Sequence, residues 1–257
     1  MGRGGAHCTT VEKVEVLGVP VARLTTPQAR NEVVRLYEGD RPALVAYANA
    51  HTLNLASSDS GYREVLRSAD IVLNDGAGLT IAGRLYGRPF PDNLNGSDFN
   101  PVILEEAAAR GWPVFILGAR PGVAEEAVRR LGDRIPGLEM AGMRDGYFAP
   151  ESSEEVAQEI AAAGTGLLMV AMGNPLQETW LNRHLEATGA RLGVGVGAFV
   201  DFSAGIVPRA PAWMNRVGIE WIYRLLQEPR RMWRRYVLGN PVFLARVLRE
   251  RFAGRRR

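Results

Sequence analysis

The chain has 257 residues, 46% hydrophobic and 23% charged, and is long enough to fold around a sizeable core as one domain with or without an appendage. Its single cysteine, Cys8, excludes intrachain disulfides and a cysteine-rich zinc site, and fits a reducing cytosol. The N-terminus lacks the apolar run of a secretory signal, and the longest apolar stretches fall far short of the roughly 20 residues of a bilayer span. Any membrane contact is therefore expected to be peripheral.

The net charge of +3 divides unevenly along the chain. Residues 209–257 hold 13 arginines against three glutamates, a net charge of +10. Residues 1–208 carry 18 basic and 25 acidic side chains, a net charge of −7. An acidic body with a basic tail indicates that the tail meets an anionic partner.

The first 200 residues alternate short apolar runs with amphipathic segments, which predicts an α/β fold with a Rossmann-like, mostly parallel sheet and helices on both faces. Most of the runs lack strict alternation, as expected of strands buried on both faces. The expected strands are residues 14–18, 43–49, 70–74, 113–118, 138–143, 166–172 and 191–197.

Capping residues and prolines mark where the helices are expected to begin. The predicted starts are Thr26-Pro27, Ser97, Pro121 and Pro150. Pro89 and Pro91 interrupt the helix that contains residues 79–85, so residues 87–96 are expected to form a loop.

The alternation ends near residues 208–211, which predicts an α/β catalytic domain over residues 1–208 and a helical, arginine- and tryptophan-rich C-terminal appendage over residues 209–257. In the appendage, Arg231 and Arg234 are spaced to share a helix face. Arginine suits bidentate phosphate binding, and tryptophan and tyrosine favour membrane interfaces. An alternative is a helix that docks on the body through its aromatic residues and leaves its arginines in water.

Polar residues stand at the ends of two consecutive predicted strands. Asp75 follows the strand 70–74 and precedes a glycine-bearing turn into a helix, and Asn49 ends the strand before it. Ligands of open α/β sheets bind at such carboxyl ends of strands, so both side chains are expected in one crevice. Each also has a structural interpretation, Asp75 as a helix N-cap and Asn49 as a turn residue.

Two later predicted strands end in the same way. One leads through residues 173–175 into a helix whose first turn carries Gln177 and Glu178. The helix dipole alone explains a carboxylate such as Glu178, whereas the neutral amide of Gln177 gains little from the dipole and can hydrogen-bond a sugar or phosphate. The other, residues 191–197, runs into a glycine-bearing loop with Asp201, which is suited to closing over a nucleoside.

Familiar nucleotide and metal signatures are missing. Gly76, Gly78 and Gly83 do not fit G-x-G-x-x-G, because the third glycine comes two positions late. The sequence contains no Asp-x-Asp pair to clamp a divalent ion, and His51 shares no ligand spacing with the other histidines. We therefore expect no metal or cofactor. If the chain is a transferase, positive side chains or backbone N–H groups must neutralise the leaving diphosphate.

Four motifs, in order, resemble the WecB/TagA/CpsF family of glycosyltransferases, also called glycosyltransferase family 26. They are NDGAG (74–78), MGNPLQE (172–178), GVGAFVDFSAG with VPRAP (195–211) and EWIYRLLQEPRRMWRRY (220–236). The resemblance covers about residues 12–245. It implies an inverting, metal-independent enzyme that transfers an N-acetylmannosamine-type or related hexose from a UDP-sugar to polyprenyl-diphosphate-linked N-acetylglucosamine, in teichoic acid or other cell-surface polysaccharide synthesis.

The resemblance also assigns roles to residues of this chain. It implies that Asp75 is the general base, that Asn49 positions a sugar and that Gln177 contacts the reacting sugars. The candidate substrate-binding residues are Asn93, Gly118, Gly173, Asn174, Gly197, Asp201, Arg224, Arg231 and Arg234. Asp201 would lie by the nucleoside, and the three arginines would hold the diphosphate.

Two positions depart from the family pattern near the presumed sugar site. Tyr47 stands where the family often has threonine, and Asn93 stands where it often has arginine. The loss of an arginine points to a neutral rather than an anionic donor sugar.

The expected location is the cytoplasm, with the tail on the inner face of the plasma membrane, and the sequence leaves a homo-oligomer open. Two other classes remain as alternatives. A Rossmann-type oxidoreductase would share the βα alternation but lacks the glycine fingerprint. An RNA-binding module would use the arginine and aromatic tail but gives no reason for polar residues at strand ends. No nucleic-acid partner is expected.

Overall fold

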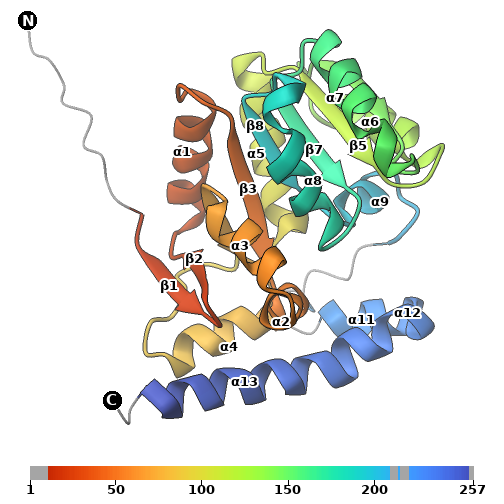
Figure 1. Cartoon of the computed structure of the whole chain (residues 1–257). Coiled ribbons are helices and arrows are strands. Elements are labelled where there is room, and N and C mark those ends of the chain that lie inside the picture. The colour runs from red at the N-terminus through yellow and green to blue at the C-terminus, as the bar shows by residue number, and fades with distance from the viewer. Residues whose placement is uncertain (1–10, 209–213, 215–219, 255–257) are drawn as a thin grey trace, which may run out of the picture.

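The computed structural model describes residues 11–208, 214 and 220–254, without the side chains of Arg224 and Arg231. Its centre is a six-stranded sheet in the order β4-β3-β8-β7-β5-β6, in which each neighbouring pair is parallel (Figure 1). The strands are β3 (Ala43–Ala48), β4 (Ile71–Asn74), β5 (Val114–Gly118), β6 (Met140–Arg144), β7 (Leu167–Ala171) and β8 (Leu192–Gly195). The predicted α/β fold and its parallel sheet are confirmed.

The first predicted strand lies outside this sheet. Strand β1 (Lys13–Val16) turns through Leu17 and Gly18, both with positive φ, and pairs antiparallel with β2 (Val19–Ala22). Strand β2 was not predicted, because Pro20 cannot donate to a ladder and is tolerated only in an edge strand such as this.

Helices cover both faces of the sheet, as predicted. Alternate residues of each strand point to opposite faces, so that Val45 and Tyr47 join one buried cluster and Leu44 and Ala46 join the other. The first face is covered by α1 (Thr26–Tyr37), α5 (Gly96–Arg110), α6 (Val123–Arg134) and α9 (Phe199–Ser203). The second is covered by α2 (Ala50–Ser58), α3 (Ser60–Ser68), α7 (Ser153–Ala162) and α8 (Leu176–His184).

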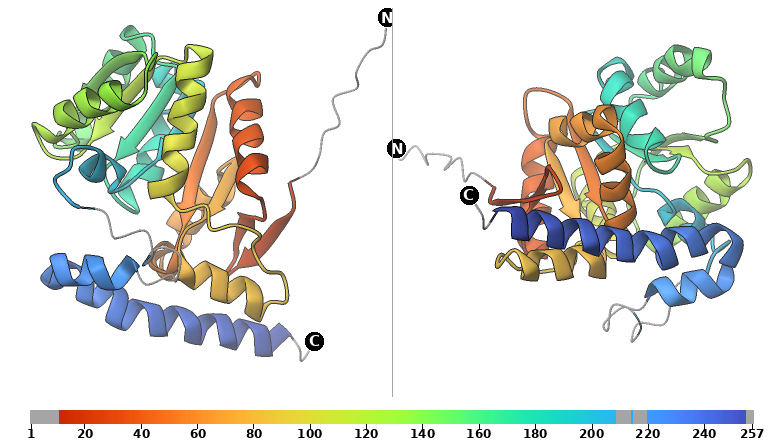
Figure 2. Two further views of the ribbon diagram at one scale, coloured as in Figure 1. Left: turned by 180° about the vertical axis from the view of Figure 1, so that it is seen from behind. Right: turned by 60° about the horizontal axis from the view of Figure 1, so that its bottom comes forward.

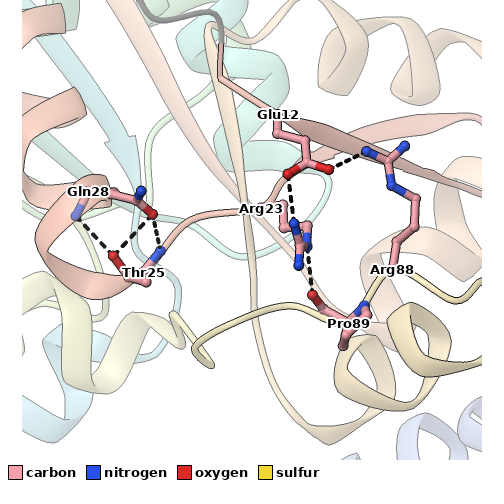
Figure 3. Close-up of polar contacts among 6 residues, drawn as sticks. All are labelled: Glu12, Arg23, Thr25, Gln28, Arg88 and Pro89. Atoms are coloured by element: carbon pink, nitrogen blue, oxygen red, sulfur yellow. Dashed lines mark hydrogen bonds and ion pairs between the residues drawn. The ribbon is translucent and has the colours of Figure 1, made fainter.

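Most helix starts lie within two or three residues of the predicted positions. Helix α1 is capped by Thr25, whose side chain exchanges hydrogen bonds with Gln28 (Figure 3). Asn95 caps α5 two residues before the predicted cap, Ser97, because the short side-chain amide of Asn95 accepts the Asp98 N–H. Figure 3 also shows Glu12 paired with Arg23 and Arg88, which joins the β-hairpin to the loop before α5.

The remaining elements are short helices and the C-terminal segment. They are α4 (Ala77–Leu85), the 3-10 turns η1 (Pro150–Ser152) and η2 (Glu186–Thr188), α11 (Glu220–Gln227), α12 (Pro229–Trp233), the π-helical turn η3 (Arg234–Leu238) and α13 (Gly239–Gly254). Helix α13 runs across the end of the molecule beside α4 and α2 (Figure 2). Within the described residues, no helix is long and apolar enough to cross a membrane.

The predicted C-terminal helix is therefore present, and it packs into the body. Phe243 and Val247 are 0% exposed within the second core cluster. Asn54 of α2 donates to the Gly239 carbonyl at 2.7 Å, and Arg246 returns a bond to the Asn54 carbonyl at 3.0 Å. The division into domains at residue 208 stays a prediction, but α13 shares a core with residues on the other side of it.

Candidate active site

A cavity of about 1110 Å³ lies at the carboxyl ends of the central strands. The connection from β3 leads outward to β4 at one edge of the sheet, and the connection from β5 leads outward to β6 at the other edge. The strand order therefore reverses between β3 and β5, over β8 and β7, and ligands of open sheets bind at such a point. Of the predicted site residues, Asn49, Asp75, Asn93, Gly173, Asn174, Gln177, Gly197 and Asp201 line this cavity.

Asn49 and Asp75 are joined across the ends of β3 and β4. The Asn49 amide donates to Asp75 Oδ2 at 3.1 Å, and its oxygen accepts the N–H groups of His51 and Thr52, which caps α2. Asp75 does not cap α4, because the N-cap is Gly76, with φ of 87°. Asn49 thus caps α2 and also contacts Asp75. The interpretation of Asp75 as a helix N-cap is wrong.

Asn93 stabilises the turn that follows Asp75. Its side-chain oxygen accepts the Gly76 N–H at 2.7 Å. The loop before α5 is thereby tied to the start of α4, so a change at Asn93 would shift the turn that carries Asp75.

Two neutral rings stand beside this pair. Burial, with a smaller contribution from the charge of Arg235, lowers the pKa of His51 to about 4, so its imidazole is neutral at pH 7. Burial and then the Asp75 carboxylate hold the pKa of Tyr47 well above its usual value. The Tyr47 hydroxyl donates to the Asn100 side-chain oxygen at 2.7 Å. Tyr47, which stands where the family often has threonine, is thus a buried, hydrogen-bonded phenol.

Gln177 connects two glycine turns on the opposite side of the cavity. Its side-chain oxygen accepts the N–H groups of Gly173 and Gly197, each at 3.1 Å. Both glycines have positive φ, 78° and 54°. The amide oxygen is thus engaged by the backbone, a role that the resemblance did not indicate.

Glu178, a carboxylate that the helix dipole alone was expected to explain, is buried. It is 0% exposed and accepts hydrogen bonds from Tyr62, Asn174 and Gln177. No sequence signal distinguishes it from a surface carboxylate, because Tyr62 lies 116 residues earlier.

Two predicted site residues do not line the cavity. Gly118 has φ of 128°, and a Cβ there would lie 2.5 Å from the Ala171 backbone, so close strand packing requires glycine. Arg234 is exposed with its guanidinium near the Trp233 ring, whereas the next residue, Arg235, lines the cavity. The side chains of Arg224 and Arg231 lie outside the described part of the structure.

The C-terminal segment forms one wall of the cavity. Glu228, Met232, Arg235 and Phe243 are among its lining residues. Asp201 lines the same cavity from α9, and its backbone carbonyl accepts the Ile206 N–H at 3.1 Å. No group of three or more potential metal ligands occurs among the described residues.

Known proteins of one family match this chain. The model of the Glycosyl transferase WecG/TagA/CpsF family matches residues 14–257. A protein of Bacillus spizizenii named N-acetylglucosaminyldiphosphoundecaprenol N-acetyl-beta-D-mannosaminyltransferase is 35% identical over 210 residues, 82% of this chain and 80% of its own length. A protein of the same name from Bacillus subtilis is 31% identical over 208 residues, 81% of this chain and 80% of its own length. The resemblance carried by the four motifs is confirmed, and the chain belongs to the WecG/TagA/CpsF family of glycosyl transferases.

Proposed function

We propose that this chain is an inverting, metal-independent glycosyltransferase. It moves an N-acetylmannosamine-type or related hexose from a UDP-sugar to a polyprenyl-diphosphate-linked N-acetylglucosamine, in the synthesis of a cell-surface polysaccharide or teichoic acid. The observation that carries the proposal is the Asn49–Asp75 pair in a cavity of about 1110 Å³. That volume exceeds a usual small-molecule site and leaves room for two substrates.

The names of the two relatives support the substrate class. Each names an N-acetylmannosaminyl group transferred to N-acetylglucosaminyldiphosphoundecaprenol. Asn93, where the family often has arginine, favours a neutral donor sugar, and N-acetylmannosamine is neutral. Preference for a uronic-acid nucleotide would contradict this part of the proposal.

In the proposed reaction, Asp75 accepts the proton of the acceptor hydroxyl as that oxygen attacks the anomeric carbon. Attack from the face opposite UDP inverts the configuration. The Asn49 amide, bonded to Asp75 Oδ2 at 3.1 Å, orients the carboxylate. Asp75 is half-buried and lines the cavity, so the carboxylate is within reach of a bound acceptor.

The leaving diphosphate requires positive charge. Arg235 lines the cavity, and its charge acts on His51 close to the Asn49–Asp75 pair. We assign Arg235 to the diphosphate, together with Arg224 and Arg231 from the resemblance; Arg234, which is exposed and does not line the cavity, is left out of this assignment. Asp201 would lie by the nucleoside, on the other side of the cavity.

The C-terminal helices offer a surface for a lipid-linked acceptor. Trp233, Val237, Leu238, Val242 and Phe252 are between 42% and 59% exposed. Arginines alternate with these apolar side chains along the same helices, a composition typical of peripheral binding to anionic lipid. We therefore propose that this segment lies on the inner face of the plasma membrane.

The proposal is tested by transfer from a panel of UDP-hexoses and UDP-N-acetylhexosamines to lipid-diphosphate-linked N-acetylglucosamine, with EDTA present. We expect the wild-type protein to transfer the sugar, and we expect the rate of transfer to be at least ~100-fold lower in Asp75→Asn, since positioned general bases contribute about 10²–10⁴-fold. Asp59→Asn is the matched control: Asp59 caps α3, and asparagine caps equally well. Equal rates in wild type and Asp75→Asn would remove Asp75 as base, and no transfer with any donor would contradict the function.

A further inference from the structure

A fully buried carboxylate lies beneath the cavity and has no part in the proposed chemistry. Glu178, in the first turn of α8, is 0% exposed. Its Oε2 accepts the Tyr62 hydroxyl at 2.9 Å, and its Oε1 accepts the amides of Asn174 at 2.6 Å and Gln177 at 2.7 Å. Burial raises the pKa of Glu178 to about 7, although these hydrogen bonds lower it. A carboxylate is a costly choice for such a position, since an apolar side chain would pack there without a desolvation penalty.

The bond to Glu178 fixes which way the Gln177 amide faces. The Gln177 oxygen accepts two backbone N–H groups, and this leaves its NH₂ pointing at the carboxylate. The reversed amide would place donors against the two N–H groups and an oxygen against the carboxylate, which would break three hydrogen bonds. An acceptor at position 178 therefore selects the one orientation that holds the backbone.

The backbone groups held in this way belong to two separate turns. Gly173 follows β7 and Gly197 follows β8, which are neighbouring strands of the sheet. Both turns line the cavity. A Cβ on Gly195 would lie 2.9 Å from Gln177 Nε2 and 3.1 Å from Glu178 Oε1, so Gln177 and Glu178 fill the space next to β8. Glu178 also holds Asn174, in the first of the two turns, directly.

We infer that Glu178 is a positioning residue: acting through Gln177 and Asn174, it holds the Gly173–Asn174 and Gly197 turns in the arrangement that binds the sugar-nucleotide donor. It touches no substrate, because Gln177 and Asn174 stand between it and the cavity. The part of this inference that concerns the donor rests on the proposed function, whereas the part that concerns the two turns does not.

Two substitutions separate hydrogen bonding from simple packing. In Glu178→Gln, the new oxygen accepts from Gln177 and Asn174, and the new NH₂ donates to the Tyr62 hydroxyl, so all three contacts survive. In Glu178→Ala, the amides of Gln177 and Asn174 lose their acceptor. If Glu178→Ala fails to fold, Glu178→Leu fills the same space and carries the test, since apolar replacement of a buried charge is tolerated.

We expect Glu178→Gln to keep the donor KM of wild type within about threefold. Glu178→Ala should raise the donor KM about tenfold or more, the value of one lost charge-assisted hydrogen bond, and leave the acceptor KM nearly unchanged. Leu181→Ala is the control for packing, because Leu181 lies on the same helix, is 0% exposed and bonds to neither turn. It should lower thermal stability and leave the donor KM unchanged.

Hydrogen exchange of the free proteins tests the two turns without any turnover. Exchange in residues 172–178 and 195–199 should be faster in Glu178→Ala than in wild type, and unchanged in Glu178→Gln. Unchanged exchange and an unchanged donor KM in Glu178→Ala would overturn the inference, and so would a Glu178→Gln variant as impaired as Glu178→Ala. If no donor is transferred even by wild type, the proposed function fails, and exchange alone decides whether Glu178 holds the turns.

Discussion

Replacement of Phe243 by alanine should release the C-terminal helix from the body. The side chain is 0% exposed and packs where α13 meets α4, close enough that a Cβ on Gly78 would lie 3.5 Å from its ring. Truncation of a buried phenylalanine costs about 3–5 kcal/mol. Because a factor of ten in an equilibrium constant corresponds to about 1.4 kcal/mol, the undocked population of α13 should rise at least ~100-fold.

Hydrogen exchange in residues 239–254 measures this opening directly. The control is Phe252→Ala on the same helix, because Phe252 is 59% exposed and its truncation should change stability by less than about 0.5 kcal/mol. Exchange should accelerate in Phe243→Ala alone, and the strands should keep wild-type protection. Transferase activity should fall with it, since Phe243 and Arg235 form part of the cavity wall.

Equal exchange in the Phe243→Ala and Phe252→Ala variants would contradict the expectation that Phe243 holds α13 on the body. That result would mean that polar contacts, such as the bonds between Arg246 and Asn54, suffice to hold α13 in place.

Two further predictions concern stability. Gly118→Ala should destabilise the protein by more than about 4 kcal/mol, because the new Cβ would lie 2.5 Å from the Ala171 backbone and Gly118 has φ of 128°. Gly111→Ala is the control and should cost only about 1 kcal/mol, because Gly111 has φ of 64° and its Cβ would meet no atom within 4 Å. Urea unfolding measures the stability of both variants. Folding raises the pKa of Glu178 to about 7, so between pH 4.5 and 7 the folded state binds more protons than the unfolded state. The wild-type protein therefore loses stability as the pH rises through this range. Glu178→Gln lacks this titration, and its stability relative to wild type should increase by about 2 kcal/mol between pH 5 and 8; a constant difference would contradict the raised pKa.

The sheet could be predicted because the pattern of a doubly covered parallel strand is local. Residues 43–49 and 166–172 are continuous apolar runs, and each became a central strand within one residue of the expected bounds. The hairpin could not be predicted, because its second strand, residues 19–22, is short and contains Pro20. Nothing local showed that the strand at residues 13–16 would pair with its neighbour instead of joining the main sheet.

The candidate site was partly predictable for the same reason. Parallel strands bring their carboxyl ends to one edge, so Asn49 and Asp75 could be assigned to one crevice from the strand ends alone. Glu178 could not, because its burial depends on Tyr62 from another helix. Which of Arg234 and Arg235 lines the cavity could not be predicted either, since helical spacing does not determine which face of the π-helical turn lies toward the cavity.

The two sides of the cavity are built by different means, and this difference bears on how it works. On the side of β3 and β4, polar side chains face the cavity, and Asn49 and Asn93 hold the turn that carries Asp75. On the side of β7 and β8, backbone turns face it, and Gln177 holds them from below. In the proposed reaction, the base on the first side must be aimed at one hydroxyl, whereas rigid backbone on the second side is enough to bind a nucleotide. Residues of the C-terminal helices line the same cavity, so we expect the docking of Phe243 to determine whether Arg235 joins both sides in one site.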